Sequence, residues 1–127
     1  MALLTFLVED NRILRDNLVP ALEELIDARV VGTAETEAEA RAWLAAHVDE
    51  WQLLIVDLFL REGSGLGVLR HCMNRPERQR AVVLSNFVNA DVRARCRALG
   101  ADAVFDKSKD LDAFIDYCVR GSSVAHT

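Results

Sequence analysis

Several features that mark other classes of protein are scarce or missing in this chain. Its three cysteines, Cys72, Cys96 and Cys118, show no C-x-x-C spacing, so neither a disulfide framework nor a zinc site is expected. We expect three reduced thiols and a cytoplasmic protein. The first ten residues reach acidic side chains too early for a signal peptide. No apolar run approaches the roughly 18 residues of a membrane span, so no membrane partner is predicted.

Positive charge is also limited, with 15 Lys and Arg residues against 20 Asp and Glu, and the formal net charge is −5 at pH 7. This balance argues against direct binding of nucleic acid, which usually needs a basic surface. Hydrophobic residues make up 51% of the chain, which is too many for a disordered protein. We predict a single domain at 1–127, with its core at about 3–120 and a short tail at 121–127.

Strand-like apolar runs alternate five times with helical patterns. The strands are predicted at 3–8, 29–34, 52–57, 81–85 and 102–105. The helices are predicted at 11–27, from 37 onward behind a capping box of Thr36 and Glu39, at 66–74 before Pro76, at 90–99 between Asn89 and Gly100, and at 111–120 after Asp110. The first helix contains Pro20, and its apolar face is predicted from Leu14, Leu18, Leu22, Leu25 and Ile26.

Five such repeats predict an α/β fold with a doubly wound, five-stranded parallel sheet. The run 52–57 is the most apolar and is expected at the centre. The run 29–34 ends without chemically useful side chains, which favours an edge position. These features predict the flavodoxin-like strand order 2-1-3-4-5, in which the ends of the first and third strands are neighbours.

Four of the strand-like runs end on polar residues suited to phosphoryl chemistry, namely Glu9 with Asp10, Asp57, Ser85 and Lys107. In an open parallel sheet, ligands bind beyond the carboxyl ends of the strands. The fold would therefore bring three carboxylates, a hydroxyl and an ammonium together at one edge. This set predicts a site for a divalent cation and a transferable phosphoryl group.

Carboxylates this close repel one another by about 4 kcal/mol per pair at 4 Å and an effective dielectric near 20, and a cation relieves the repulsion. An all-oxygen ligand set favours Mg²⁺ or Mn²⁺. We predict that Asp10 and Asp57 bind the metal, that Glu9 binds it directly or through water, and that the Phe59 carbonyl completes the shell.

Asp57 is the predicted nucleophile, which would form an aspartyl phosphate. Lys107 could pair with Asp57 or with phosphoryl oxygens, and Ser85 could hydrogen-bond a phosphoryl oxygen. Taken singly, each residue also has a plainer interpretation. The pair Glu9 and Asp10 could cap the first helix, Ser85 could be a cap, and Lys107 could be a surface lysine.

With these residues in place, the chain resembles the receiver domain of two-component response regulators over about residues 3–120. Glu9 and Asp10 match the family's metal-binding acids, and Asp57 in the segment LLIVDL matches its phospho-acceptor. Three further residues match a loop glycine, a switch hydroxyl and a lysine, respectively Gly65, Ser85 and Lys107.

The resemblance implies that a histidine kinase or phosphotransfer protein donates a phosphoryl group to Asp57 with Mg²⁺. Ser85 and the loop after it then move, and the face of the fourth helix, fifth strand and fifth helix changes its partners. It implies no enzyme activity beyond self-phosphorylation and self-dephosphorylation at Asp57.

The chain also departs from the family pattern. Val104 stands where the family has an aromatic switch residue, and Phe105 follows it. Because a shift of one residue reverses the face of a strand, Phe105 is expected to pack inward. The other departures are Ser108 and Arg61 at positions where proline is common, Asn86 at a position that is often small, and the aromatics Phe59 and Phe87 at positions that tune phosphoryl lifetime.

Two rival functions remain. The chain could be a pseudo-receiver that serves as an interaction scaffold without phosphorylation, or a receiver excised from a longer transcription factor or hybrid kinase. Arg93, Arg95 and Arg97 form a basic patch that is either a solvated face or a docking surface for an acidic partner. The glycines at 63–67 lack the spacing of a nucleotide loop.

Overall fold

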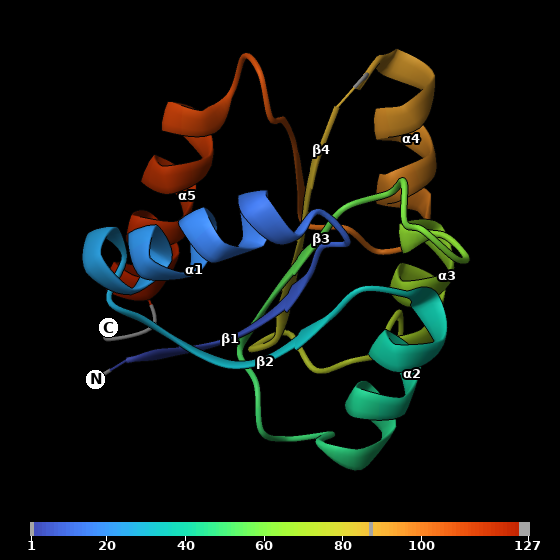
Figure 1. Ribbon diagram of the computed structural model, residues 1–127, viewed down its shortest axis with the longest axis horizontal. Helices are drawn as coiled ribbons and strands as arrows, with labels where there is room; N and C mark the ends of the chain where they lie inside the picture. The colour runs from blue at the N-terminus through green and yellow to red at the C-terminus, as the bar shows by residue number, and fades with distance from the viewer. Residues whose placement is uncertain (1, 87, 125–127) are drawn as a thin grey trace.

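The computed structural model describes residues 2–86 and 88–124, in which strands and helices alternate (Figure 1). The strands are β1 Leu3–Val8, β2 Ala28–Ala34, β3 Leu53–Val56, β4 Arg80–Ser85 and β5 Ala103–Asp106. The helices are α1 Arg12–Leu25, α2 Glu37–Ala46, α3 Gly65–His71, α4 Ala90–Ala98 and α5 Leu111–Val124. The predicted order of elements is confirmed.

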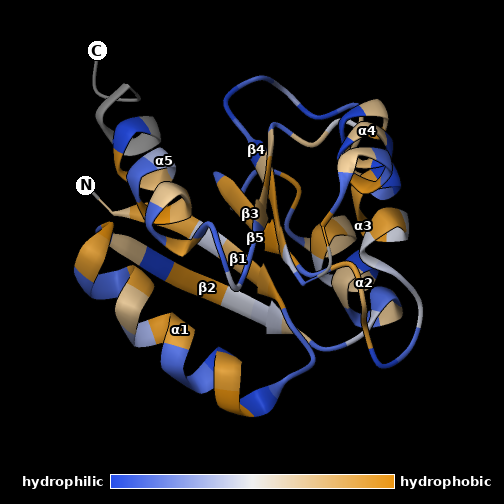
Figure 2. Ribbon diagram, turned by 90° about the horizontal axis from the view of Figure 1, so that it is seen from above, coloured by the Kyte–Doolittle hydropathy of each residue, from blue (hydrophilic) through white to orange (hydrophobic). Residues whose placement is uncertain are grey.

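All strand pairs are parallel, and the sheet has the order β2-β1-β3-β4-β5, as predicted. Helices α1 and α5 cover one face, and α2, α3 and α4 cover the other (Figure 1). Each face has its own core, the first around Leu22 and Phe114 and the second around Leu44 and Val68. The central strand β3 is buried along its whole length, and Figure 2 shows the inner strands as mostly hydrophobic. Burial on both faces explains the continuous apolar run.

Adjacent residues of β5 contribute to opposite cores. Val104 packs in the core beneath α2, α3 and α4, whereas Phe105 packs against the core beneath α1 and α5. The Phe105 ring lies edge-on to Phe114, with 5.8 Å between ring centroids, and 5.6 Å from the ring of Tyr117. The predicted reversal of side-chain direction is therefore confirmed, and Phe105 is partly buried.

Several helix ends differ from their predicted positions. Helix α1 begins after Asn11, whose side chain accepts a hydrogen bond from the Leu14 N–H at 3.0 Å, and ends at Leu25 rather than Asp27. The prediction that Leu25 joins the apolar face was wrong, because its side chain is 58% exposed. The helix has ended there, and Ile26 takes the last buried position from outside the helix.

Other element bounds differ from the predicted ones by a few residues. Helix α3 ends at His71, before the predicted residue 74, and β5 runs from Ala103 to Asp106, one residue later than predicted. Helix α5 continues to Val124, so residues 121–124 are helical rather than part of a tail. The last three residues of the predicted tail, 125–127, lie outside the described residues. No described helix is long and apolar enough to cross a membrane.

The three cysteines are free and buried, as predicted. Burial raises the pKa of the Cys118 thiol to about 12, and it also raises the pKa values of Cys72 and Cys96. Because the thiolate is the reactive form, we expect native protein to react slowly with a disulfide reagent. Unreduced, denatured protein should titrate three thiols. A count of one would contradict the structure.

Candidate functional site

The sheet brings the predicted site residues together at the carboxyl ends of its strands. Val8 of β1 pairs with Val56 of β3, so the acids that follow these strands become neighbours. The Asp57 N–H donates to the Val8 carbonyl at 3.0 Å, which fixes the relative position of the two strand ends. In the same way, the Lys107 N–H donates to the Ser85 carbonyl at 3.0 Å beyond β4 and β5. The backbone ladder thus positions each side chain.

Three carboxylates form a cluster at this edge. Each of Glu9, Asp10 and Asp57 offers one oxygen, and these atoms lie within 4.8 Å of one another. Glu9 and Asp57 are buried, with 2% and 7% exposed, and Asp10 is half-buried. A set of oxygen ligands with access from solvent fits a hard divalent cation that retains some of its water. The donor chemistry therefore agrees with the predicted metal site.

Lys107 supplies the positive charge at the cluster. Its Nζ donates to Asp57 Oδ2 at 2.7 Å and to Glu9 Oε1 at 2.5 Å. The side chain is 13% exposed, so Lys107 is not the surface lysine of the plainer interpretation. Burial by itself would lower the pKa of Lys107, but the hydrogen bonds and the charges of Asp57 and Glu9 outweigh burial and raise it. Lys107 therefore remains an ammonium at neutral pH.

Glu9 is stabilised less well as an anion. Burial raises the pKa of Glu9, and the charge of Asp57 also raises it. The hydrogen bonds from Lys107 and from the Asn11 N–H act in the opposite direction without cancelling the effect of burial. One ammonium therefore does not fully balance the cluster, which is the condition that a bound cation would relieve.

Ser85 lies under the cluster rather than at a helix end. Its hydroxyl donates to Asp57 Oδ1 at 2.7 Å, and the residue is fully buried. The Phe59 N–H also donates to Oδ1, at 3.2 Å. With Lys107 on Oδ2, both carboxylate oxygens of Asp57 have partners, as a buried acid requires. Ser85 therefore does not cap a helix, since Asn89 caps α4.

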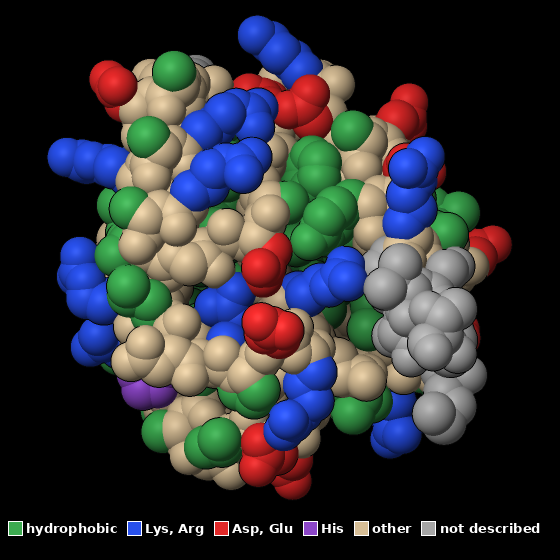
Figure 3. Space-filling model, turned by 180° about the vertical axis from the view of Figure 1, so that it is seen from behind, with side chains coloured by type: hydrophobic (Ala, Val, Ile, Leu, Met, Phe, Trp, Pro, Cys, Tyr) green, Lys and Arg blue, Asp and Glu red, His purple; other side chains and the backbone are tan. Residues whose placement is uncertain are grey.

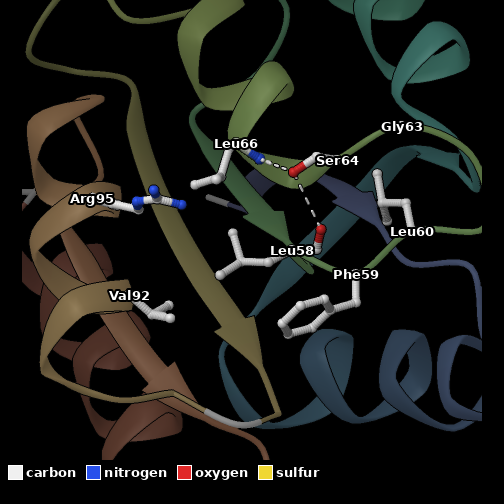
Figure 4. A pocket seen from close by; sticks show the side chains of 8 residues that line it. All are labelled: Leu58, Phe59, Leu60, Gly63, Ser64, Leu66, Val92 and Arg95. Carbon is white, nitrogen blue, oxygen red and sulfur yellow. Dashed lines mark hydrogen bonds between the residues drawn. The ribbon is translucent and has the colours of Figure 1, made fainter.

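Phe59 lies close to the site, but its predicted role as a carbonyl ligand remains a prediction. Its side chain is 57% exposed and turns toward a neighbouring pocket (Figure 4). Phe87, the other aromatic expected to tune phosphoryl lifetime, lies outside the described residues.

Gly65 is required by the close approach of its backbone to the loop after Asp57. A Cβ atom on Gly65 would lie 2.2 Å from the Asp57 carbonyl oxygen and 2.8 Å from Leu58 Cα. The Gly65 N–H donates to the Leu58 carbonyl at 3.0 Å, so the two segments cannot separate without losing this bond. The match to the family's loop glycine thus has a steric reason in this chain.

We expect Gly65→Ala to destabilise the protein by about 2 to 3 kcal/mol, since the backbone must shift to admit the methyl group. This corresponds to a fall in melting temperature of about 5 to 10 °C. Gly67→Ala is the comparison, because there the atoms nearest the added Cβ belong to the Glu37 side chain, which can move away at the loss of its bond to the Ser64 N–H. We expect this variant to be destabilised less than Gly65→Ala, where backbone atoms must move. Equal melting temperatures for the two variants would contradict the steric argument.

Two residues that support the site were not identified from the sequence. The Arg15 guanidinium donates to the Glu9 carbonyl at 2.9 Å and to Glu35 at 2.8 Å, which fixes the turn after β1. Glu37 of α2 accepts from the Ser64 N–H at 2.9 Å and thereby fixes the loop between β3 and α3. The contacts of Arg15 with Glu35 and of Glu37 with Ser64 join residues 20 and 27 positions apart, and no local sequence motif indicates them.

The predicted basic patch on α4 is not uniform. Arg93 donates to the Val104 carbonyl on β5 at 2.7 Å and lies 3.3 Å from Asp110 Oδ2. Asp110 Oδ2 also accepts from the Asp106 N–H at 3.0 Å. Arg95 and Arg97 are exposed. Arg93 therefore joins α4 to the edge strand β5, whereas Arg95 and Arg97 project into solvent.

The molecule seen from behind carries both signs of charge. Figure 3 shows Lys and Arg side chains interspersed with Asp and Glu on this face, with hydrophobic side chains between them. The basic side chains are not gathered into one area.

A parallel 2-1-3-4-5 sheet, with acids after β1 and β3 and a lysine after β5, defines the receiver class of signalling domains. Residues 5–118 match the family described as "Response regulator receiver domain". The chain belongs to this family, which is a family of signalling modules rather than of catalytic enzymes.

The chain is also similar in sequence to a known regulatory protein. The chain is 30% identical over 87 residues to the transcriptional regulatory protein CitB of Klebsiella pneumoniae, a match that covers 68% of this chain and 35% of that protein. The match thus spans about a third of the length of this curated relative.

Solved structures share the fold. One is a LuxR-family DNA-binding response regulator from Staphylococcus aureus, with 14% identity, a TM-score of 0.82, and coverage of 94% of this chain and 98% of that one. Another is a response regulator from Burkholderia pseudomallei with a phosphorylated aspartic acid, a calcium ion and citrate. It has 22% identity and a TM-score of 0.77, and the match covers 98% of this chain and 71% of that one.

Proposed function

We propose that this chain is a phosphoacceptor receiver domain, in which Asp57 accepts a phosphoryl group from a histidine kinase or a phosphotransfer protein. The observation that carries the proposal is the environment of Asp57. Its two oxygens contact Lys107 and Ser85, and it lies beside Glu9 and Asp10. A buried acid that has polar partners and adjoins a metal-binding cluster is suited to nucleophilic chemistry.

The transfer conserves atoms and charge. An Asp57 oxygen forms a bond to phosphorus while the phosphorus–nitrogen bond of the donor imidazole breaks, and the imidazole leaves with the electron pair. Lys107 and Ser85 already donate to Asp57, so they are placed to donate to the new phosphoryl oxygens. Mg²⁺, held by Asp10, Asp57, Glu9 and the Phe59 carbonyl, would neutralise charge on the transferred group.

The named relatives support parts of this proposal. The Burkholderia pseudomallei protein carries a phosphorylated aspartic acid and a calcium ion. By analogy, we assign Asp57 as the acceptor and a hard divalent cation as its cofactor here, with Mg²⁺ as the physiological metal and Mn²⁺ as a substitute. These assignments predict that substitution of Asp57 or Asp10 should block phosphorylation.

The output surface is proposed at α4, β5 and α5, where a protein partner would bind. The CitB and Staphylococcus aureus relatives are a transcriptional regulator and a DNA-binding regulator. If this chain is part of such a protein, its output would be an attached domain. We also propose that the chain acts in the cytoplasm, where it would meet a sensor histidine kinase or a phosphotransfer protein.

Phosphorylation should alter the segment that joins β4 to α4. A phosphoryl group adds a charge of about −1.5 to −2 at Asp57. The Ser85 hydroxyl, which donates to Asp57 Oδ1, would then donate to a phosphoryl oxygen instead, and this shift would move the loop that follows Ser85. Val104 provides no aromatic rotamer signal, whereas Arg93 links α4 directly to the β5 backbone. We therefore expect the response to pass through the loop and α4.

Hydrogen exchange with Mg²⁺ and beryllofluoride tests this, with Mg²⁺ alone as the control. We expect altered protection in peptides that cover residues 86–99. Binding of beryllofluoride without any change there would contradict the proposed route. Failure to bind the phosphate mimic would instead favour the interaction scaffold that is not regulated by phosphorylation.

A further inference from the structure

A second concave site lies beside the acidic cluster and is separate from it. A cavity of about 310 Å³ opens between the loop that follows β3 and the helix α4 (Figure 4). Leu58, Phe59 and Leu60 line it from the loop, Leu66 lines it from α3, and Val92 and Arg95 line it from α4. A site of this volume is at the lower limit for small-molecule pockets.

The walls of this cavity are mainly apolar. Leu58 is buried, Leu60, Leu66 and Val92 are partly buried against the core, and the Phe59 ring lies at the side of the cavity with more than half of its surface exposed (Figure 4). An exposed aromatic ring beside an apolar hollow gains free energy when another apolar group covers it. The occupant should therefore have an aromatic or branched aliphatic body.

The polar groups of the cavity restrict the occupant further. The Ser64 hydroxyl is already engaged, since it accepts from the Leu66 N–H at 3.1 Å and lies 3.5 Å from the Leu58 carbonyl. Arg95 extends from α4 across the cavity (Figure 4), and no ion pair or side-chain hydrogen bond engages it within residues 2–86 and 88–120. Its neighbour Arg93, by contrast, is engaged with β5.

A free guanidinium over apolar walls is complementary to a planar anion. The fork of N–H donors matches a carboxylate, and a carboxylate can accept from two of them at once. Without a bound cation, the acidic cluster would repel such a ligand through its own three carboxylates. The two sites therefore differ in the charge that they select.

We propose that this cavity binds a small monocarboxylate with an aromatic or branched aliphatic body, and that Arg95 binds its carboxylate. The ligand would contact both the loop after Asp57 and α4, and the Phe59 N–H in that loop donates to Asp57. A bound carboxylate would thus bridge two segments that adjoin the acidic site. The proposal does not depend on phosphorylation.

The test compares two ligands of nearly the same shape, 3-phenylpropionate and its neutral amide, 3-phenylpropanamide, which lacks the charge and one of the two acceptor oxygens. Each is titrated into ¹⁵N-labelled protein without Mg²⁺ or a phosphoryl donor, and amide resonances are followed by NMR. For a ligand of this size we expect a Kd of about 1 mM for the acid. The neutral amide should bind about fivefold or more weakly, since it lacks the charge-assisted contact. The shifted resonances should fall in residues 58–66 and 92–95.

Arg95→Gln should weaken binding of the acid about fivefold to tenfold and leave binding of the neutral amide unchanged. Arg97→Gln is the matched control, because it removes the same charge from an exposed position on the same helix that does not line the cavity. Val92→Trp should fill the cavity and weaken binding of both ligands, provided that its spectrum shows a folded protein.

Three outcomes would overturn the proposal. These are equal affinities for the acid and the amide, equal effects of Arg95→Gln and Arg97→Gln, and shifts confined to other surfaces. Because the measurement omits Mg²⁺ and phosphoryl donors, its failure would say nothing against Asp57 as acceptor. Conversely, a protein that fails to accept phosphate could still show this binding.

Discussion

Asp57→Asn is expected to abolish incorporation of phosphate from acetyl phosphate in the presence of Mg²⁺. The asparagine amide has nearly the shape of the carboxylate and can still accept from Ser85, but it is not a competent nucleophile. The loss should therefore be complete rather than partial. The measurement is intact-protein mass spectrometry, in which the phosphorylated wild type gains the mass of one phosphoryl group.

Asp106→Asn is the matched control for this experiment. Asp106 has the same small exposure as Asp57, but its carboxylate accepts from the N–H and hydroxyl of Ser108, outside the acidic cluster. We expect this variant to retain phosphorylation. Label that persists on Asp57→Asn would place the chemistry on another residue and reject the proposed acceptor.

Asp10→Asn is expected to weaken Mg²⁺ binding about tenfold or more, which corresponds to roughly 1.4 kcal/mol for each factor of ten. It should also block phosphorylation. Asp10 is the most exposed acid of the cluster and is placed to meet an entering cation. Its replacement removes one ligand charge and lessens the carboxylate repulsion that the metal relieves. Calorimetric or NMR titration with Mg²⁺ measures the affinity.

Asp16→Asn removes the same charge from the exposed surface of α1 and serves as the control. Its Mg²⁺ affinity should equal that of the wild type, apart from a small effect of net charge that salt would screen. If Asp10→Asn bound Mg²⁺ as tightly as Asp16→Asn, Asp10 would not be a metal ligand.

The sequence contained most of the fold because each strand buried on both faces appears as a continuous apolar run. The run ending at Val56 is the clearest case, and the structure places β3 at the centre of the sheet. The first residues of helices could also be predicted, because capping side chains close in sequence mark them. The Asn89 side chain accepts from the Val92 N–H at 2.9 Å, and Thr36 accepts from the Glu39 N–H at 3.1 Å. Both signals act over three residues.

The ends of helices and the exposure of individual side chains were harder to predict from the sequence. Leu25 fits an apolar helix face by spacing, yet the helix ends there and its side chain is exposed. The end of α3 at His71 precedes the proline that was expected to set it. Helix α1 is followed by Asp27, whose backbone is left-handed with a φ of 52°, and the spacing of apolar residues does not mark such a local stop.

The residues of the site were likewise determined by the sequence itself. Glu9, Asp57 and Lys107 each follow a strand, and parallel topology obliges the carboxyl ends of the strands to meet at one edge. Only the tertiary structure decided how these groups pair, with Lys107 between Glu9 and Asp57. The contact of Arg93 with β5 and the position of Arg95 beside an apolar cavity could also be learned only from the tertiary structure. The physical reason is that topology fixes strand ends to within a few ångströms, whereas hydrogen bonds and ion pairs depend on side-chain packing between segments far apart in the chain.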